Sequence, residues 1–486
     1  MKRFIFTVTC IFLAALAGLA QEFPAVSYED IEASKGYVNG NVCQKDLLLY
    51  SRTMEISHPY YADRKHVKEL RKDTRKLYKE LAEKDDLNAF RCGLQALTSH
   101  LNDGHSQVAS GFSTNLIYPM YLMFDMKDSA YMLAVEDDFK ETLGKRIIMV
   151  NGKPISDLIA RGHKFISGDN EIYKNSQLSK QLQMKGFWEM CGYNGDAIDL
   201  AFDDGTLVTI PATPMQGIKI EQMDMTFNSP TALRQVPFFY EVLDSLGICY
   251  LQFNMCADKV THPQLGERFD DVVEKMMVEM ADKSIPTLVV DVRNNGGGNS
   301  ALCDVLLSYL TDYDSMKNVG CKVRMSELLL KHQPNLSGVV LNDGTTPENG
   351  EVFDFWQVRR VGAMESESTH RINHDSDKIY KGNVIFISGR GSYSSAGLLL
   401  TLARDNNIGT IIGETSGHRP SHFGDVLRFC LPNTDTKATV SCRHFTRPDE
   451  SRNDEIELVP DVEVNLSDYT IKSDPAWNWI IENSNK

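Results

Sequence analysis

The first part of the chain carries apolar residues at helical spacing. From residue 42 to residue 101 the sequence is charged, nearly free of glycine and proline, and has apolar residues three or four positions apart, such as Leu77 and Leu81. This spacing brings apolar side chains to one face of a helix. We therefore expect a helical N-terminal domain over residues 21–112.

The pattern changes in the following hundred residues. Short alternating or wholly apolar runs (IYPMYLMF, YMLAVE, KRIIMVNGKPI, AIDLAF and TLVTIP) are separated by polar turns. Alternation with a period of two is typical of strands, and the pair Asn151-Gly152 favours a tight turn. The pattern predicts a small β-rich module over residues 113–218.

The last region alternates between strand-like and helix-like segments. Its strand candidates are GICYLQF, PTLVVDV, NVIFISG, GTIIGE and ATVSCRHF, with helix candidates between them. This alternation predicts a layered αβ domain over residues 236–480. The fold class predicted for the chain is therefore α/β, with α+β character from the first two regions.

The N-terminus has the pattern of an export signal. Lys2 and Arg3 precede an uncharged run from Phe4 to Leu19, and small residues close the segment. This pattern predicts a signal peptide over residues 1–20, which places the mature protein in the periplasm or outside the cell. No other stretch approaches the roughly 20 apolar residues of a spanning helix, so no membrane span is predicted.

Charge and cysteine content exclude several classes of function. A formal net charge of -15 argues against nucleic acid as a partner, since phosphate binding needs concentrated Lys and Arg. The ten cysteines include Cys10 of the signal peptide and contain no C-x-x-C pair. Neither a zinc site nor a dense disulfide framework is indicated, and no metal or organic cofactor is implied. The nine remaining cysteines leave at least one free thiol, for which Cys249 is the candidate.

A glycine-rich loop follows a predicted strand. In PTLVVDVRNNGGGNSALC, the apolar run ends near Asp291, and Gly296, Gly297 and Gly298 lead directly into a helical segment. Consecutive glycines can present backbone N–H groups to an anion or an oxyanion, although such a loop also serves as a tight connection. It is neither a phosphate-binding Walker loop nor a dinucleotide fingerprint.

A second strand, loop and helix follow in NVIFISGRGSYSSAGLLLTL. Ser394 and Ser395 fall at the start of the helix. A serine there can cap the helix, or it can act as a nucleophile beside the helix N–H groups, and the two roles are compatible. The G-x-S-x-G elbow of the α/β-hydrolases is missing.

Histidines supply further candidates. His105, in LNDGHSQV, falls at the junction of the helical and β-rich regions. A histidine in a loop usually has a structural role or is solvated, but its position at a domain junction adds some weight to a functional role. His370 and His374 are four residues apart in HRINH, but the Glu of the H-E-x-x-H motif is absent. We interpret them as a surface pair rather than zinc ligands.

Together these segments resemble the tail-specific, or C-terminal-processing, serine peptidases, whose relatives include the tricorn core and interphotoreceptor retinoid-binding protein. In order, the matching segments are ISHPYY, LNDGH, RIIMVNGKPI, DVRNNGGG, GSYSSAG, IGTIIGETSG and ELVPDVEV, which span nearly the whole mature chain. The resemblance implies a PDZ-like module over 113–218 and a peptidase core of the ClpP/crotonase-like type over 236–480.

The resemblance also implies roles for individual residues. Ser394 matches the nucleophile, while the amides of Ser395 and of the Gly296-Gly297 turn match the oxyanion donors. In one branch of the family a lysine after G-E is the base, but that place falls on or beside Arg419 here, and arginine stays protonated.

His105 instead matches the histidine base of the tricorn-like branch, and a neutral imidazole suits the task. His418 is an inferior candidate. In that branch an acidic residue before the final V-x-P-D holds the histidine, partly through a serine that this chain replaces by Gly104. The acidic candidates are Asp454, Glu455 and Glu457, and we choose Glu455. Gly397 is a further departure, since many relatives carry Glu there.

The predicted function is that of a secreted serine endopeptidase that hydrolyses extended or C-terminal segments of peptides or unfolded proteins through an acyl-enzyme. The PDZ-like module would pair an extended peptide by strand addition, or it serves only as a packing domain. Two alternatives are a catalytically silent protein that holds a peptide or apolar ligand on the same fold, and an esterase. The sequence does not indicate an oligomeric state.

Overall fold

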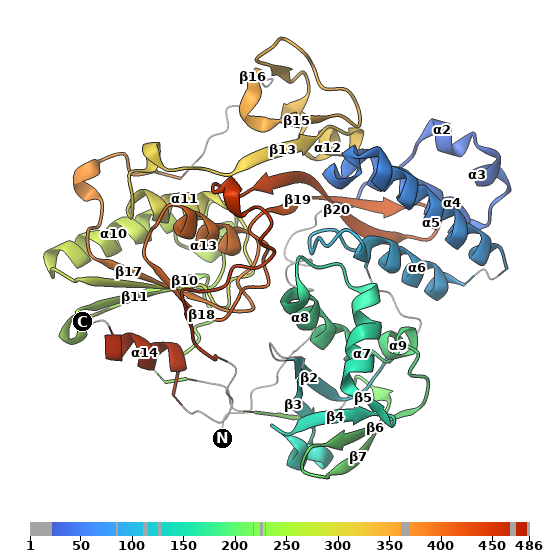
Figure 1. The fold of residues 1–486 in the computed structure, drawn as a ribbon, viewed down its shortest axis with the longest axis horizontal. Helices are drawn as coiled ribbons and strands as arrows, with labels where there is room; N and C mark the ends of the chain where they lie inside the picture. Colours follow the sequence, from blue (N-terminus) through green and yellow to red (C-terminus); the bar gives the residue numbers. More distant parts are fainter. Residues whose placement is uncertain are drawn as a thin grey trace.

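The computed structural model describes residues 22–83, 86–109, 115–124, 129–216, 218–223, 227–228, 230–360, 370–466 and 473–483. The predicted signal peptide, residues 1–20, lies outside these residues. Three bodies make up the fold: an αβ core, a group of N-terminal helices against a long hairpin, and a β-rich module (Figure 1).

The αβ core is built on a six-stranded sheet. Its strands, in order, are β10 (Phe238–Leu243), β11 (Ile248–Phe253), β12 (Thr287–Asp291), β17 (Asn383–Ser388), β18 (Thr410–Gly413) and β21 (Val462–Glu463). β10 is antiparallel to β11, and every other pair is parallel. β11 and β12 are buried throughout, as expected of central parallel strands covered on both faces.

Helices cover both faces of this sheet. α10 (Phe269–Asp282), α11 (Ala301–Ser308) and α13 (Ser395–Asp405) share one hydrophobic core with it, and α14 (Pro475–Asn483) packs on the other face (Figure 1). The loops from β12 to α11 and from β17 to α13 leave the carboxyl edge of neighbouring parallel strands, where sites form in such folds. The predicted α/β class is confirmed.

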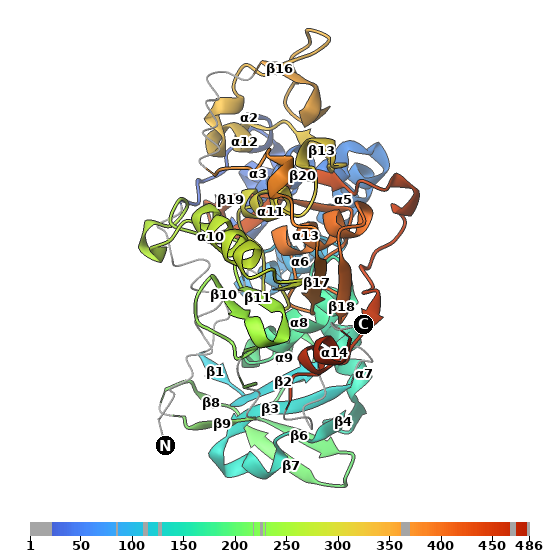
Figure 2. The ribbon, with the colours of Figure 1, turned by 90° about the vertical axis from the view of Figure 1, so that its left-hand side faces the viewer.

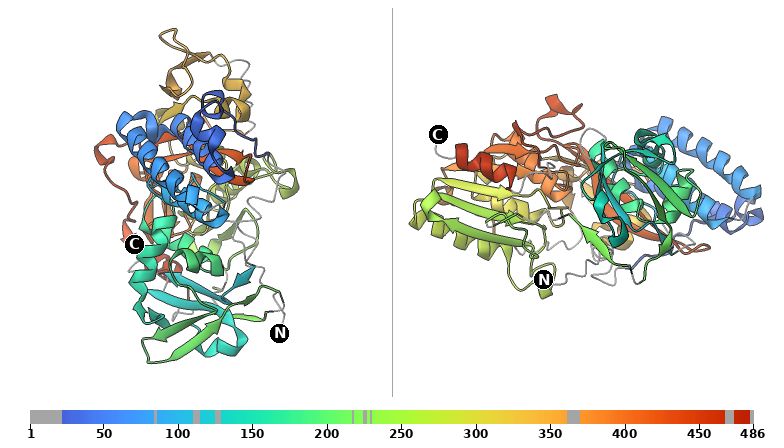
Figure 3. Two further views of the ribbon diagram at one scale, coloured as in Figure 1. Left: turned by 90° about the vertical axis from the view of Figure 1, so that its right-hand side faces the viewer. Right: turned by 90° about the horizontal axis from the view of Figure 1, so that it is seen from below.

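The N-terminal helices are α2 (Glu29–Glu32), α3 (Lys35–Asn39), α4 (Val42–Ser57), α5 (Arg64–Glu83) and α6 (Leu87–Ser99). They share a hydrophobic core with a four-stranded antiparallel sheet ordered β15 (Val352–Asp354), β13 (Gly320–Arg324), β20 (Thr436–Thr446) and β19 (His422–Leu431). The helices lie along the β19–β20 hairpin in two views (Figures 1 and 3). One core thus joins parts of the chain that the sequence analysis assigns to separate domains.

The β-rich module has its own core and lies below the αβ core in Figure 2. Its main strands, in order, are β2 (Met120–Phe124), β3 (Ala130–Glu136), β4 (Arg146–Val150), β6 (Ala197–Phe202) and β7 (Leu207–Pro211); β5 (Lys153–Pro154) pairs with β4 and β9 (Ile220–Gln222) with β3. Its helices are α7 (Ile155–Gly162), α8 (Glu171–Gln181) and α9 (Lys185–Met190). Positive φ angles of 47° at Asn151 and 73° at Gly152 confirm the predicted tight turn between β4 and β5.

Smaller elements complete the described chain. β1 (Leu116–Ile117) pairs with β8 (Thr213–Pro214), β14 (Val340–Leu341) pairs with β16 (Val358–Arg360), and α12 (Glu327–His332) packs near β19. No helix among the described residues is both long and apolar enough to cross a membrane.

The structure also describes the histidine pair and the cysteines considered in the sequence analysis. His370 is buried and bonds Asp258 through Nε2 at 2.9 Å, while His374 is exposed, so the predicted surface pair is wrong for His370. Burial is stabilised there by the carboxylate partner. The cysteines of the described chain are all free, and Cys249 is buried as an apolar residue.

Candidate active site

Ser394 stands where the β17 loop enters α13. It occupies the N-cap position but its side chain makes no capping hydrogen bond, and its backbone has φ 53° and ψ -124°. A non-glycine residue in this region costs about 1–3 kcal/mol, and such strain clusters at functional sites. The hydroxyl is thus aimed by the backbone rather than used to cap the helix.

His105 reaches the serine from the other side of the site. Its Nε2 lies 3.0 Å from Ser394 Oγ, within hydrogen-bond distance. The two residues are 289 positions apart in sequence. The structure therefore brings together the two side chains that the sequence analysis singled out as nucleophile and base.

The loop that carries His105 is fastened to strand β20. Gln107 and Thr439 exchange backbone hydrogen bonds, and the Thr439 hydroxyl donates to the His105 carbonyl at 2.8 Å. Ser441 also binds this loop through Ser106 Oγ. The β19–β20 hairpin thereby fixes the histidine at the junction of the three bodies.

Asp103 is a fully buried carboxylate under the same loop. Its Oδ1 accepts the His105 backbone N–H at 2.9 Å and lies 3.5 Å from His105 Nδ1. Its Oδ2 contacts His58 Nε2 at 3.1 Å and accepts the Ser441 hydroxyl at 2.7 Å. Burial raises the Asp103 pKa, but bonds and charges from His105 and His58 outweigh it, so the pKa falls well below its usual value.

A second buried carboxylate, Asp169, comes from the β-rich module. It lies two residues before α8, the helix of the module that faces the αβ core and α6 (Figure 1). Its Oδ1 accepts the Gly104 N–H at 2.8 Å and the Tyr393 hydroxyl at 3.0 Å. The same Tyr393 oxygen lies 3.1 Å from His105 Nδ1. Sequence analysis missed both Asp169 and Tyr393.

The electrostatics of this cluster favour a protonated histidine. Burial lowers the pKa of His105, yet the carboxylates of Asp103 and Asp169 overcome that effect, and the pKa is raised above 6.5. Burial also raises the pKa of Asp169 to about 6. Such shifts, set by opposing burial and charge, are typical of catalytic groups.

The predicted oxyanion donors divide into two groups. Ser395 is the first residue of α13, and the N–H groups of a first helical turn have no partner within the helix. The Gly297 amide, in contrast, donates to Asn295 Oδ1 at 2.8 Å, which corrects its assignment as a donor to the oxyanion in this arrangement. Gly296 lies in the same loop with open space beside its Cα.

Gly297 has a different task, which is close packing. A Cβ at this position would lie 2.6 Å from Ser394 Cβ and 2.9 Å from Ser395 N, and its φ is 100°. Only glycine lets the two loops approach this closely. The predicted glycine loop and the nucleophile therefore meet, although the contact is steric.

Glu455 is not the partner of His105, and the prediction is wrong on this point. Its carboxylate binds Arg447 and Arg452, each at 2.8 Å. Arg447 is fully buried and also binds the buried carboxylate of Asp405, so Glu455 is the second, partly exposed partner of this guanidinium. The acidic residues that act on His105 are Asp103 and Asp169.

His418, the inferior candidate base, is buried beside this cluster. Within the described residues neither of its ring nitrogens has a hydrogen-bond partner, and Nδ1 is 3.7 Å from Asp169 Oδ2. Burial, followed by the charges of His422 and His105, lowers its pKa well below the usual value. A Cβ at Gly397 would lie 2.2 Å from the His418 ring, so the ring occupies the space that a larger residue would need.

One group among the described residues has the donor atoms of a metal site. Asp103, His105 and Asp169 each offer a ligand atom, and these atoms lie within 4.8 Å of one another. The Tyr393 hydroxyl already contacts two of these residues, at His105 Nδ1 and Asp169 Oδ1. The group is accounted for as a hydrogen-bond network.

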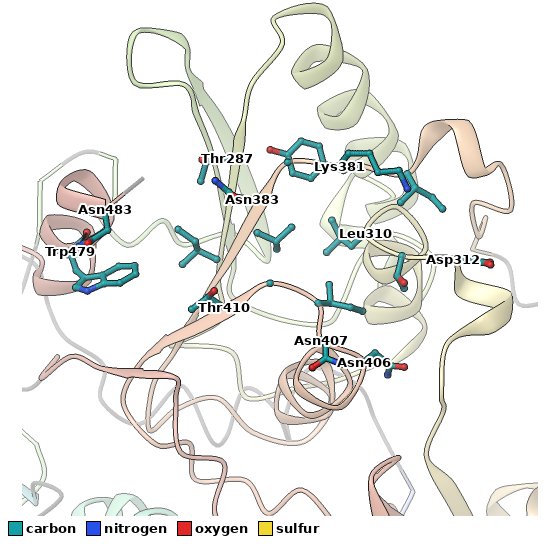
Figure 4. Close-up of a pocket in the computed structure, with 18 residues that line it drawn as sticks. Thr287, Leu310, Asp312, Lys381, Asn383, Asn406, Asn407, Thr410, Trp479 and Asn483 are labelled. Carbon is teal, nitrogen blue, oxygen red and sulfur yellow. Dashed lines mark hydrogen bonds between the residues drawn. The ribbon is translucent and has the colours of Figure 1, made fainter. Parts of the chain in front are cut away.

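A pocket of about 580 Å³ opens at the opposite end of the sheet (Figure 4). It is lined by Thr287, Asn383 and Thr410, the first residues of β12, β17 and β18, with Trp479 from α14 beside them. Ser394 and the glycine loop follow the other ends of these strands. The pocket is therefore separate from the Ser394 site.

Part of the chain matches a known protein family. Residues 248–464 match the model of Peptidase family S41. No curated protein matches the sequence.

Two solved structures of the same protein share the fold. Mature CPAF aligns with a TM-score of 0.61 at 16% identity, covering 92% of this chain and 97% of that chain. Mature CPAF complexed with lactacystin also gives 0.61, at 14% identity, covering 92% and 98%. At these identities the likeness is one of fold.

Proposed function

We propose that this protein is an exported endopeptidase that cuts extended or C-terminal protein segments, with Ser394 as nucleophile and His105 as base. The match of residues 248–464 to Peptidase family S41 supports a serine-type peptidase. The observation that carries the proposal is the 3.0 Å contact between Ser394 Oγ and His105 Nε2. A nucleophile and base within hydrogen-bond reach are the signature of covalent acyl transfer.

The reaction follows from this contact. His105 Nε2 takes the Ser394 proton as Oγ attacks the peptide carbonyl, and the imidazolium then gives that proton to the leaving amine. Water, deprotonated by the same nitrogen, attacks the acyl-enzyme; the ester bond to Ser394 Oγ breaks, the imidazolium returns the proton to Oγ, and the new carboxylate is released. The Ser395 N–H, at the positive end of α13, supports the oxyanion during both attacks.

An extended substrate is supported by the shape of the β-rich module. Among the described strands, β2 is the first in the order of the module sheet, and α8 packs against it. Extended peptides are commonly bound by strand addition to a sheet. Arg390, four residues before Ser394, donates to the carbonyl of Phe124 at the end of β2, which links this strand to the nucleophile loop. Export is supported by the pattern of residues 1–20, outside the described structure.

The test compares peptide and ester hydrolysis by the wild type, Ser394→Ala and the exposed control Ser451→Ala. We expect the wild type and the control to cut an internally quenched unfolded peptide, and Ser394→Ala to lose about 10³-fold or more of that rate. Ester cleavage without peptide cleavage would indicate an esterase. Peptide binding without either activity would indicate a silent binding protein.

A further inference from the structure

The Nδ1 atom of His105 has a closer partner than either nearby carboxylate. Tyr393 Oη lies 3.1 Å from Nδ1, whereas Asp103 Oδ1 lies 3.5 Å away, beyond a normal hydrogen bond. Tyr393 Oη in turn lies 3.0 Å from Asp169 Oδ1. The phenol therefore stands between the imidazole and the carboxylate of the β-rich module.

The direction of these hydrogen bonds follows from the number of hydrogens. A phenol has one hydrogen to donate, and an ionised carboxylate only accepts. Tyr393 therefore donates to Asp169, and its lone pair accepts the hydrogen of His105 Nδ1. The proton of neutral His105 then sits on Nδ1, and Nε2 is left as the acceptor for the Ser394 hydroxyl.

Asp103 is already occupied with holding the loop. Its Oδ1 accepts the backbone N–H of His105, and its Oδ2 contacts both Ser441 and His58. The charge of Asp103 acts on His105, but three of the roughly four lone-pair sites of its carboxylate face these other donors, and Oδ1 lies 3.5 Å from Nδ1. Asp103 thus fixes where the loop lies, and Tyr393 is left to fix which ring nitrogen carries the proton.

The packing holds the phenol in this place. A Cβ at Gly104 would come within 2.4 Å of Tyr393 Oη and 2.6 Å of the Tyr173 ring. The Tyr393 ring lies against His105 and Tyr173, with centroid separations of 4.9 and 4.5 Å. Burial, together with the charge of Asp169, raises the Tyr393 pKa well above 10, so the hydroxyl keeps its hydrogen at every working pH.

We propose that Tyr393 and Asp169 are positioning residues, which hold His105 in the tautomer that accepts the Ser394 proton. The inference rests on the proposed roles of Ser394 and His105 and deepens them. We call the hydrogen-bonded chain of Asp169, Tyr393 and His105 the relay. It transfers no proton, because the Tyr393 hydrogen stays on its oxygen and the imidazolium formed in the reaction keeps its Nδ1 hydrogen. Through Asp169, the β-rich module contributes directly to the catalytic centre of the αβ core.

The pH dependence separates the two positioning residues. The titratable groups facing the relay are Asp103, His58, Tyr173, His418 and His422. Asp169 raises the pKa of His105, so Asp169→Asn should move the acid limb of kcat/KM to lower pH and lower kcat. Tyr393→Phe keeps the Asp169 charge, so its acid limb should stay in place while kcat falls.

The experiment measures kcat and KM against pH for Tyr393→Phe, Asp169→Asn and the matched control Tyr118→Phe. Tyr118 is buried in the β-rich module and donates its hydroxyl to the Gly195 carbonyl at 3.0 Å. We expect about a 10- to 100-fold loss of kcat at unchanged KM for both relay variants, a share of the roughly 10²–10⁴-fold that a placed general base contributes. The control should keep kcat within about threefold. Thermal unfolding confirms that each variant is folded.

Full kcat in folded Tyr393→Phe would overturn the relay while Ser394-dependent hydrolysis by the wild type still supported the proposed function. If the wild type showed no Ser394-dependent hydrolysis, the proposed function would instead be contradicted. In that case ¹⁵N NMR of the His105 ring, assigned with His105→Gln, decides the relay alone. Nδ1 protonation at neutral pH that is lost in Tyr393→Phe supports it, and protonation of Nε2 in the wild type overturns it.

Discussion

Two buried aspartates face the same histidine from different regions of the molecule, and their surroundings drive them in opposite directions. Asp103, under the β20 strand, lies between the imidazoles of His58 and His105, and its pKa falls well below the usual value. Asp169, before α8, is raised to a pKa of about 6, because burial and the charge of Asp103 oppose its ionisation. Ionised Asp103 therefore stabilises the folded state, whereas ionised Asp169 destabilises it.

Removing Asp103 is the most severe test of this comparison. Asp103→Ala leaves His58, Ser441 and the loop backbone without their buried acceptor. Breaking one side of a buried charged network costs about 3–5 kcal/mol, so we expect a loss of that size in the free energy of unfolding, measured in urea. The exposed Asp138→Ala serves as control. A loss below about 1 kcal/mol would remove the structural role.

Asp169→Asn should have the reverse effect on stability. The ordinary Asp pKa is 3.8 and the folded value is about 6, so above pH 6 ionisation of Asp169 penalises the folded state. Two pKa units correspond to roughly 3 kcal/mol, so we expect the variant to gain up to about that much at pH 7. A variant that is more stable but less active would mark Asp169 as a functional group. Marked destabilisation at pH 7 would contradict this view.

The difference in unfolding free energy between the wild type and Asp169→Asn should disappear in acid. Between pH 6 and pH 4 the folded state takes up a proton at Asp169 while the unfolded chain has not yet done so, so folding stability recovers as pH falls. The wild type should therefore approach Asp169→Asn in unfolding free energy over this range. Urea unfolding of both proteins at pH 4, 5, 6 and 7 measures it, and a constant gap would contradict the assigned pKa shift.

Gly104→Ala tests whether the space between the two regions is as tight as the geometry requires. The new Cβ would meet Tyr393 and the Tyr173 ring, and overpacking of this kind costs about 1–3 kcal/mol. We expect that loss of stability together with a lower kcat. Gly36→Ala, whose Cβ would meet its nearest neighbour at an ordinary 3.5 Å, is the matched control. Equal behaviour of the two variants would show that the site has room.

Glu455→Gln should have the smallest effect. The side chain is partly exposed and binds Arg447 and Arg452, and such pairs contribute about 1 kcal/mol or less. We expect a stability change within that limit and no change in kcat or its pH profile. A large fall in kcat would restore Glu455 as a partner of the histidine.

Much of the fold was readable from local patterns. The five apolar runs predicted for the last region are β11, β12, β17, β18 and β20. The first four belong to the six-stranded sheet, whose central strands are buried on both faces and therefore stand out in the sequence. The division into domains was less accessible. The N-terminal helices complete their core with strands more than two hundred residues later, and no pattern within either segment announces that contact.

The residues of the site likewise differ in how much the local sequence indicates about them. Ser394 and His105 carry local signals, a serine at a helix start and a histidine at a domain junction. Tyr393 and Asp169 carry none, since a phenol inside GSYSSAG and an acid before a helix each have ordinary explanations. Their meaning arises only when the module docks on the core. For Glu455 a signal was present: Arg447 and Arg452, close by in sequence, are natural partners for that carboxylate.

The central claim is that His105 activates Ser394, and covalent labelling tests it most directly. The wild type and His105→Ala are treated with a fluorophosphonate, the adduct is weighed on the intact chain, and its position is mapped by peptide mass spectrometry. We predict a single adduct on Ser394 that forms about 10²–10⁴-fold more slowly in His105→Ala. An adduct on another serine, or labelling of Ser394 at the same rate without His105, would contradict the account.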